Sequence, residues 1–430
     1  MCASTTTAGT WCWRCGVVPR LTRDGGKDLA GLLWLLGSTA CTIACGWTLQ
    51  VLAIHRLGDL EYSSFVFALA IGSIAAILGG AIQPVVAASA MKGEGSWLSA
   101  SAAPLAGAIA ALTGALILVT APAVGFAIAI LSIVQLPIHL AVGVVSGWLQ
   151  ARRAYRALSI AALCWTGARI LLALGAPLFL SSAVAFLLAL PAALAVQFAC
   201  LAIAHHQAGS LRESRQAPVA VPWGMLLAWC AIGWIVYGDG VMARLVLGPS
   251  AAADYALALT LGRQAIYVAT PVATVILPIA ATSGLAGRRR LFLATIGAMG
   301  CMFGGLWLAL GTFPGETVKL VLLNPSYESL TAVRLYALIG TVSFGALLLA
   351  SLLTGSGAGI RAAPLAAIAV LSTATMAWLT DSPGSMAVVQ LMAVAAAGVL
   401  ILQQCAANVW HRYKTSPGSS EWASAPVPGA

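Results

Sequence analysis

Apolar runs long enough to cross a lipid bilayer recur along almost the whole chain, and they restrict what it can fold into. A helix needs about 20 residues to cross the hydrocarbon core, and about twelve such segments lie between residues 29 and 410. Only 8% of the 430 residues are charged, whereas a soluble domain carries about 25%. We therefore predict an all-α polytopic membrane protein with about twelve transmembrane helices.

The predicted spans form two groups of six, separated by a polar segment. They cover residues 29–54, 63–90, 98–120, 123–149, 155–180, 182–205, 222–246, 252–282, 291–312, 332–355, 361–380 and 385–410. Sixteen of the 22 Lys and Arg residues fall on the side of the N-terminus and four on the other side. Because cytoplasmic loops carry the excess of basic residues, both termini are predicted to be cytoplasmic. These loops also account for the net charge of +10 without a nucleic-acid partner.

Two bundles of six spans with the same orientation predict parallel repeats related by an axis along the membrane normal. The stretch LGDLEYSSF from Leu57 and the stretch LGPSAAADY from Leu247 echo each other before a predicted helix. Chance similarity in an Ala- and Leu-rich sequence is the alternative. The predicted parts are a cytoplasmic tail at 1–28, a bundle at 29–206, a cytoplasmic linker at 207–221, a second bundle at 222–411 and a tail at 412–430.

Three charges lie deep in predicted spans, where each costs about 2.5–3.5 kcal/mol on insertion scales. Asp239 lies roughly 10 Å and Arg263 roughly 16 Å from the outer end of neighbouring antiparallel spans, which predicts an Asp239–Arg263 pair. Arg169 lies near the middle of its span and is left over. A surplus cation in a cavity suits a diphosphate or an acidic sugar, because Arg binds such oxygens bidentately. The alternatives are a pair that only locks two helices and an Arg169 that binds backbone carbonyls.

Polar side chains within other spans are further candidates for lining a cavity. An interhelical hydrogen bond is the alternative for each of them. They are Gln83, Gln135, His139, Gln197 and Gln264. Five prolines are predicted to kink or break their helices: Pro84, Pro137, Pro191, Pro271 and Pro278.

The sequence carries no recognisable catalytic, metal or cofactor motif. It has no HExxH, no Walker A motif and no paired carboxylates within a span. The CWRC stretch at Cys12 to Cys15 lacks a second pair or a nearby His that would complete a zinc site. Asp59 and Glu61 are the one pair of acids that could pose as catalytic, in a predicted outer loop. We predict a protein that is not an enzyme and needs no cofactor.

Four stretches, taken in order, carry a likeness to a known family. They are LGDLEY at 57–62, GWLQARRAYRALSIAALCWTGAR at 147–169, VYGDGVMARLVLGPSAAADYALALTLGRQ at 236–264 and LLNPSYESL at 322–330. Through their order and their positions between spans, the chain resembles the multidrug/oligosaccharidyl-lipid/polysaccharide (MOP) exporter superfamily, and within it the Wzx-type polysaccharide flippases. The resemblance covers residues 29 to 410, and each motif alone is degenerate.

The resemblance implies a MATE-like fold in which two six-helix bundles face a central cavity. It implies alternating-access movement of a lipid-linked oligosaccharide, a polysaccharide precursor, from the inner to the outer leaflet of the cell inner membrane or plasma membrane. The expected partners are the bilayer and the glycan polymerase and glycosyltransferases of the same pathway, around a monomeric transporter.

Two other functions are weighed against this one. A drug or metabolite antiporter of the same fold, coupled to a cation, would need acids in the N-terminal spans, which hold none. A membrane glycan polymerase or ligase would need a large outer loop, but the longest one predicted, Phe313 to Thr331, is short.

Overall fold

The described chain is built from helices joined by short turns and contains no strand. The computed structural model describes residues 18–92, 113–118, 120–122, 125–175, 183–208, 223–262, 264–312, 330–356 and 360–414. Within these residues, nine helical stretches are long and apolar enough to cross a membrane. The prediction of an all-α polytopic membrane fold is confirmed.

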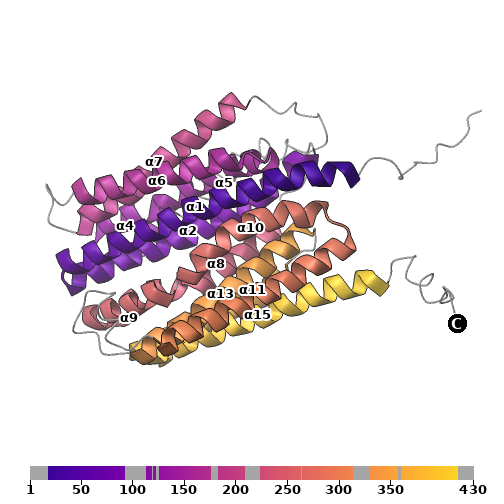
Figure 1. Cartoon of the computed structure of the whole chain (residues 1–430). Helices are drawn as coiled ribbons and strands as arrows, with labels where there is room; N and C mark the ends of the chain where they lie inside the picture. The colour runs from indigo at the N-terminus through magenta and orange to yellow at the C-terminus, as the bar shows by residue number, and fades with distance from the viewer. Residues whose placement is uncertain are drawn as a thin grey trace, which may run out of the picture.

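The helices of the N-terminal half run back and forth along one common direction (Figure 1). They are α1 (Val18–Arg56), α2 (Asp59–Lys92), α4 (Phe126–Ile133), α5 (Gln135–Ala151), α6 (Tyr155–Gly175) and α7 (Ala183–Gln207). The predicted span at 98–120 lies mostly outside the described residues, of which 113–118 and 120–122 are helical.

The helices of the C-terminal half lie beside them as a second group (Figure 1). They are α8 (Trp223–Val246), α9 (Pro249–Gly262), α10 (Gln264–Thr282), α11 (Leu285–Thr312), α13 (Leu330–Gly355), α14 (Ala362–Leu379) and α15 (Pro383–Lys414). Helices α8 and α13 are largely buried, whereas few residues of α14 are buried, which suits a lipid-facing position.

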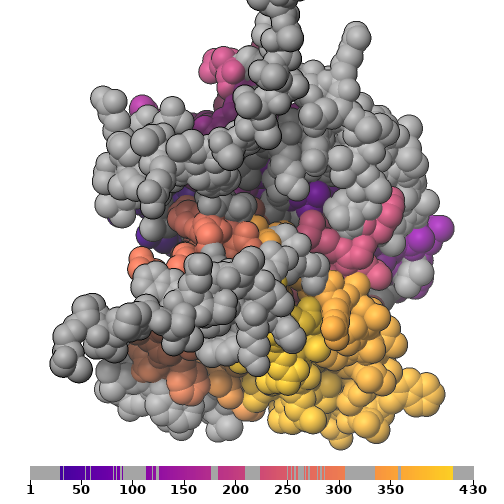
Figure 2. All heavy atoms as spheres, turned by 90° about the vertical axis from the view of Figure 1, so that its right-hand side faces the viewer, coloured from indigo at the N-terminus to yellow at the C-terminus, as the bar shows by residue number. Residues whose placement is uncertain are grey.

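The two ends of the molecule differ in charge. The α5–α6 turn with Arg152 and Arg153 and the start of α11 with Arg288–Arg290 lie at the same end, to the right in Figure 1. We call it the basic end. Figure 2 views the molecule from this end and shows the two halves as separate colour groups. The α1–α2 and α8–α9 turns lie at the opposite end (Figure 1).

Close backbone packing joins α2 and α5 inside the N-terminal half. A methyl group at Gly143 would overlap the backbone of Gly79, and one at Gly147 would meet the carbonyl oxygen of Gln83 at 2.5 Å. Small residues let helix backbones approach in this way in membranes. The second face of α2 packs on the C-terminal half, where Ile74 and Ile77 contact its apolar core.

The helices differ from the predicted spans in some of their bounds and in how they pass their prolines. The predicted span 123–149 is broken at Val134 into α4 and α5, three residues before Pro137, which has no N–H to continue the ladder. Helices α2, α7 and α10 continue through Pro84, Pro191, Pro271 and Pro278, so these four prolines do not break their helices. The α1 helix begins at Val18, ahead of the predicted span at 29–54.

Candidate functional site

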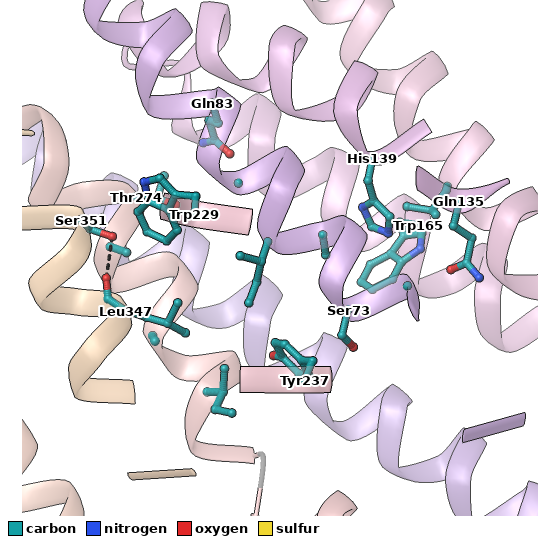
Figure 3. Close-up of a pocket in the computed structure, with 18 of the residues that line it drawn as sticks. Ser73, Gln83, Gln135, His139, Trp165, Trp229, Tyr237, Thr274, Leu347 and Ser351 are labelled. Atoms are coloured by element: carbon teal, nitrogen blue, oxygen red, sulfur yellow. Dashed lines mark hydrogen bonds between the residues drawn. The ribbon is translucent and has the colours of Figure 1, made fainter. Parts of the chain in front are cut away.

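A cavity of about 220 Å³ lies between the two halves. The N-terminal half lines it with residues of α2, α5, α6 and α7, and the C-terminal half with residues of α8, α10 and α13. In Figure 3 Gln135, His139 and Trp165 lie on one side of the cavity, and Thr274, Trp229 and Ser351 lie on the other.

The polarity of the cavity is one-sided. Arg169 is the one charged residue among the described residues that line it, and the amides and the imidazole also come from the N-terminal half. The C-terminal wall is mostly apolar, with Ile266, Leu277 and Leu347 among its residues. Its Ser351 hydroxyl donates to the carbonyl oxygen of Leu347 in its own helix at 2.9 Å (Figure 3).

Arg169 reaches the cavity from α6, one helical turn after Trp165. Its guanidinium carbon lies 5.5 Å from the centre of the Trp165 ring, a distance at which the ring quadrupole attracts a cation. Both side chains line the cavity. The structure thus presents a cation backed by an aromatic face to the space between the halves.

Two glutamines in the lining of the cavity form a hydrogen-bonded chain between the two halves. Gln83 on α2 donates through Nε2 to Oε1 of Gln150 at 2.8 Å. Gln150 on α5 donates through Nε2 to the carbonyl oxygen of Thr274 on α10, also at 2.8 Å. The second bond joins the N-terminal half to the C-terminal half.

Gln135 and His139 line the cavity but are held within their own half. The Nε2 of Gln135 donates to the carbonyl oxygen of Leu131 at 3.2 Å. Its Oε1 lies so close to α2 that a Cβ added at Gly72 would be only 2.6 Å from it. The backbone of His139 packs against Gly79, which also belongs to α2. These contacts place Gln135 and the backbone of His139 against α2.

Asp239 is 1% exposed and is not among the residues that line the cavity. Its Oδ2 accepts a hydrogen bond from the Tyr255 hydroxyl of α9 at 2.9 Å, and its Oδ1 accepts one from the Gly240 N–H at 2.8 Å. The Tyr336 ring lies edge-on to Tyr255, with 5.2 Å between the ring centres. The carboxylate is thus buried among polar partners inside the C-terminal half.

The glycine before Asp239 is covered rather than open. A Cβ at Gly238 would meet the Trp234 ring at 2.9 Å, and the Trp234 Nε1 donates to Thr373 Oγ1 of α14 at 2.7 Å. Arg244, five residues after Asp239, makes a hydrogen bond to a different residue. Its Nε donates to the Ser64 hydroxyl of α2 at 3.5 Å.

Two predicted site residues cannot be compared with the cavity. Arg263 and the side chain of Gln264 lie outside the described residues, as does the CWRC stretch. The Asp239–Arg263 pair and the binding roles of all the candidates therefore stay predictions. In the part of the chain that the structure describes, no three His, Cys, Asp or Glu residues gather as a metal site would require.

Sequence reasoning missed several residues that line the cavity. Gln150, Trp165, Trp229 and Tyr237 all face it. Gln150 carried a signal, because it is a polar residue at the end of an apolar run, next to the basic turn. The aromatic residues carried none, because aromatic side chains in an apolar helix are as compatible with core packing as with a cavity.

No family model and no curated protein matches this sequence. Solved structures of MATE transporters do match the fold. An outward-facing multidrug resistance MATE family transporter of the MOP superfamily superposes with a TM-score of 0.55 and 14% identity, over 90% of this chain and 97% of that chain. An inward-facing one gives 0.53 and 12%, over 90% and 99%.

A third similar structure is a MOP superfamily transporter from Pyrococcus furiosus, for which a binding pocket of reverse polarity suggests a different function. It superposes with a TM-score of 0.52 and 10% identity, over 90% of this chain and 96% of that chain. At sequence identities this low, the superpositions show a shared fold and nothing more. The chain therefore has a MATE-like membrane fold, as the sequence predicted.

Proposed function

We propose that this protein is an alternating-access membrane transporter, not an enzyme, and that the cavity between its halves takes the substrate. Two observations support this. The fold is shared with MATE transporters described in both inward-facing and outward-facing conformations. The cavity lies where two packed groups of helices meet, so that tilting one group against the other would change which end it opens to.

The substrate that we propose is a lipid-linked oligosaccharide, moved from the inner to the outer leaflet of the cell inner membrane or plasma membrane. The observation that carries this proposal is the one-sided polarity of the cavity. Arg169 is the charged residue among the described residues that line it, and an anionic group such as a diphosphate or an acidic sugar gains a charge-assisted bond there. Gln83, Gln135 and His139 add partners for sugar hydroxyls, and Arg263 and Gln264 are proposed to join them.

Asp239 keeps a proposed role next to the cavity rather than in its wall. Its hydrogen bond to Tyr255 ties α8 to α9. Arg263 directly follows α9 in the sequence. A pair between Asp239 and Arg263 would hold that arginine in place for the substrate. The glycan polymerase and glycosyltransferases of the same pathway are the proposed partners, and the transporter is proposed to act as a monomer.

A cation-coupled drug or metabolite antiporter is the second candidate. The similar structures described as multidrug resistance transporters favour it. The lack of an acidic group among the described lining residues weighs against a cationic drug. The two candidates differ in the charge of the substrate, and this difference can be measured.

The test uses the purified protein in lipid vesicles. A fluorescent undecaprenyl-diphosphate saccharide is followed by quenching with an impermeant reductant, and cation-driven uptake of ethidium is measured in parallel. We expect saccharide translocation and no ethidium uptake. Arg169→Ala and Arg263→Ala should each lower translocation by about 10-fold or more, as expected for losing hydrogen bonds to a charged group.

Arg290→Ala is the matched control, because Arg290 is exposed at the basic end and does not line the cavity. It should translocate at the parental rate. Full translocation by both arginine variants would overturn the proposed anion site, and ethidium uptake without saccharide translocation would favour the antiporter.

A further inference from the structure

The hydrogen bond from Gln150 to Thr274 joins the two halves at the floor of the cavity. The two amide bonds, from Gln83 to Gln150 and from Gln150 to Thr274, are each 2.8 Å long, which is within the usual range for N–H···O bonds. Gln150 is 2% exposed, so water does not compete for its amide. Because Gln83 occupies Oε1, the Nε2 group is left to face the Thr274 carbonyl.

Both glutamines belong to one rigid unit. The contacts of Gly143 with Gly79 and of Gly147 with the carbonyl of Gln83 leave no room for even a methyl group between α2 and α5. These two helices must therefore move together when the halves move. Gln83 and Gln150 travel with them, whereas Thr274 belongs to α10 of the other half.

The bond lies on the side of the cavity nearer the basic end. Gln150 is the second-last residue of α5, directly before the basic turn. An apolar contact accompanies it, in which Leu35 of α1 and Tyr155 of α6 belong to the same cluster as Val275 of α10. Tilting the halves apart at the basic end would separate this cluster and break the bond from Gln150 to Thr274.

At the opposite end, other contacts join the halves. The Arg244 Nε of α8 donates to the Ser64 hydroxyl of α2. Val241 of α8 packs in one cluster with Phe67 and Ala70 of α2. These contacts do not involve Gln150, so they should persist when the basic end opens.

We propose that Gln150 is a latch that holds the basic end of the transporter closed beneath the cavity, with Gln83 orienting its amide. The inference rests on the proposed alternating-access function. It assigns a gating role to a residue whose polar atoms face both the cavity and the contact between the halves. Its loss shifts the equilibrium toward a state that is open at the basic end.

Distances between spin labels test the latch. In a cysteine-free protein in lipid nanodiscs, Gln207→Cys and Arg289→Cys report on the basic end, because both sites are exposed there and belong to different halves. Leu60→Cys and Leu245→Cys report on the opposite end. Gln150→Met keeps the length of the side chain and removes both hydrogen bonds.

We expect Gln150→Met to raise the ratio of long to short distances at the basic end by about 2- to 10-fold, the range expected for one hydrogen bond. The distances at the opposite end should not lengthen. Gln83→Met, which keeps the bond to Thr274 but no longer orients it, should shift the basic end in the same direction and by less. It also provides the test if Gln150→Met does not fold.

Gln135→Met is the matched control. Gln135 is the same type of residue, is buried and lines the same cavity, but donates to Leu131 within its own half. Its distance distribution should equal that of the parent. The latch is overturned if Gln150→Met leaves the basic-end distances unchanged, or if Gln135→Met lengthens them equally. Because no substrate is present, this result is independent of whether the saccharide is transported.

Discussion

At the scale of single residues, the polar side chains that interrupt the apolar spans have separated into two environments. Gln83, Gln135, His139 and Arg169 line the cavity, whereas Asp239 is buried and accepts hydrogen bonds from Tyr255 and Gly240. The sequence identified all five because a polar group stands out in an apolar run. It could not separate the two environments, because that depends on which face of each helix meets the other half.

The buried Asp239 gives the first prediction. Tyr255→Phe removes the hydroxyl that donates to Asp239 Oδ2 at 2.9 Å. Hydrogen bonds to charged groups contribute about 1.5–3 kcal/mol, and the partner here is buried. We expect the free energy of unfolding to fall by an amount in this range, measured by denaturant titration in detergent micelles.

Tyr62→Phe is the control for that measurement. The Tyr62 hydroxyl donates to the neutral Gln50 Oε1 over 3.4 Å, so its removal should cost less, about 0.5 kcal/mol. A loss for Tyr255→Phe as small as that expected for Tyr62→Phe would contradict a charge-assisted bond from Tyr255 to Asp239.

At the scale of helices, the lengths of the apolar runs predicted the helices, but the positions of the prolines did not predict where a helix is interrupted. Pro137 follows a break, whereas Pro191 lies within a continuous α7. Neighbouring helices re-satisfy the backbone around a proline in membranes, so a proline alone does not predict an interruption. The division at Val134 brings Gln135 to the start of α5.

The contact between α2 and α5 also depends on glycine, which gives the second prediction. Gly143→Ala would place a methyl group on the Gly79 backbone. Overpacking of this kind costs about 1–3 kcal/mol, so we expect a lower midpoint of thermal unfolding, measured by fluorescence in detergent.

Gly46→Ala on α1 is the comparison, because a Cβ there has no atom within 4 Å. Alanine is favoured over glycine in a helix by about 0.5–1 kcal/mol, so this variant should be at least as stable as the parent. A Gly143→Ala protein with parental stability would mean that α2 and α5 separate without cost, and it would weaken the case for their moving as one unit.

At the scale of the whole molecule, the cavity between the halves is small for a substrate site. Small-molecule sites usually measure about 300–1,000 Å³, and this cavity measures about 220 Å³. The proposed substrate, a lipid-linked oligosaccharide, needs more room, so under this proposal the halves separate further before it enters. The sequence predicted two groups of helices, but the residues that hold them together are far apart in the chain. Gln150 and Thr274 are 124 positions apart, and no local pattern predicts such a pairing.

The orientation of the molecule in the membrane gives the last prediction. The α1–α2 and α8–α9 turns lie at one end, and each exposes a glycine, Gly58 and Gly248. Gln207 and Arg289 are exposed at the basic end. Because basic loops stay in the cytoplasm, Gly58→Cys and Gly248→Cys should react with an impermeant maleimide in intact spheroplasts. Gln207→Cys and Arg289→Cys should react only after the membrane is permeabilised.

The variants Gly58→Cys and Gly248→Cys also test whether the two halves have the same orientation in the membrane. Six spans in each half place equivalent turns on the same side of the membrane, whereas an odd number would place them on opposite sides. Gly58→Cys and Gly248→Cys should therefore react alike in every sample. If one reacts only after permeabilisation, the parallel arrangement is wrong. If both do, and the basic-end pair reacts in intact spheroplasts, the arrangement stands and the direction of transport across the membrane must be reversed.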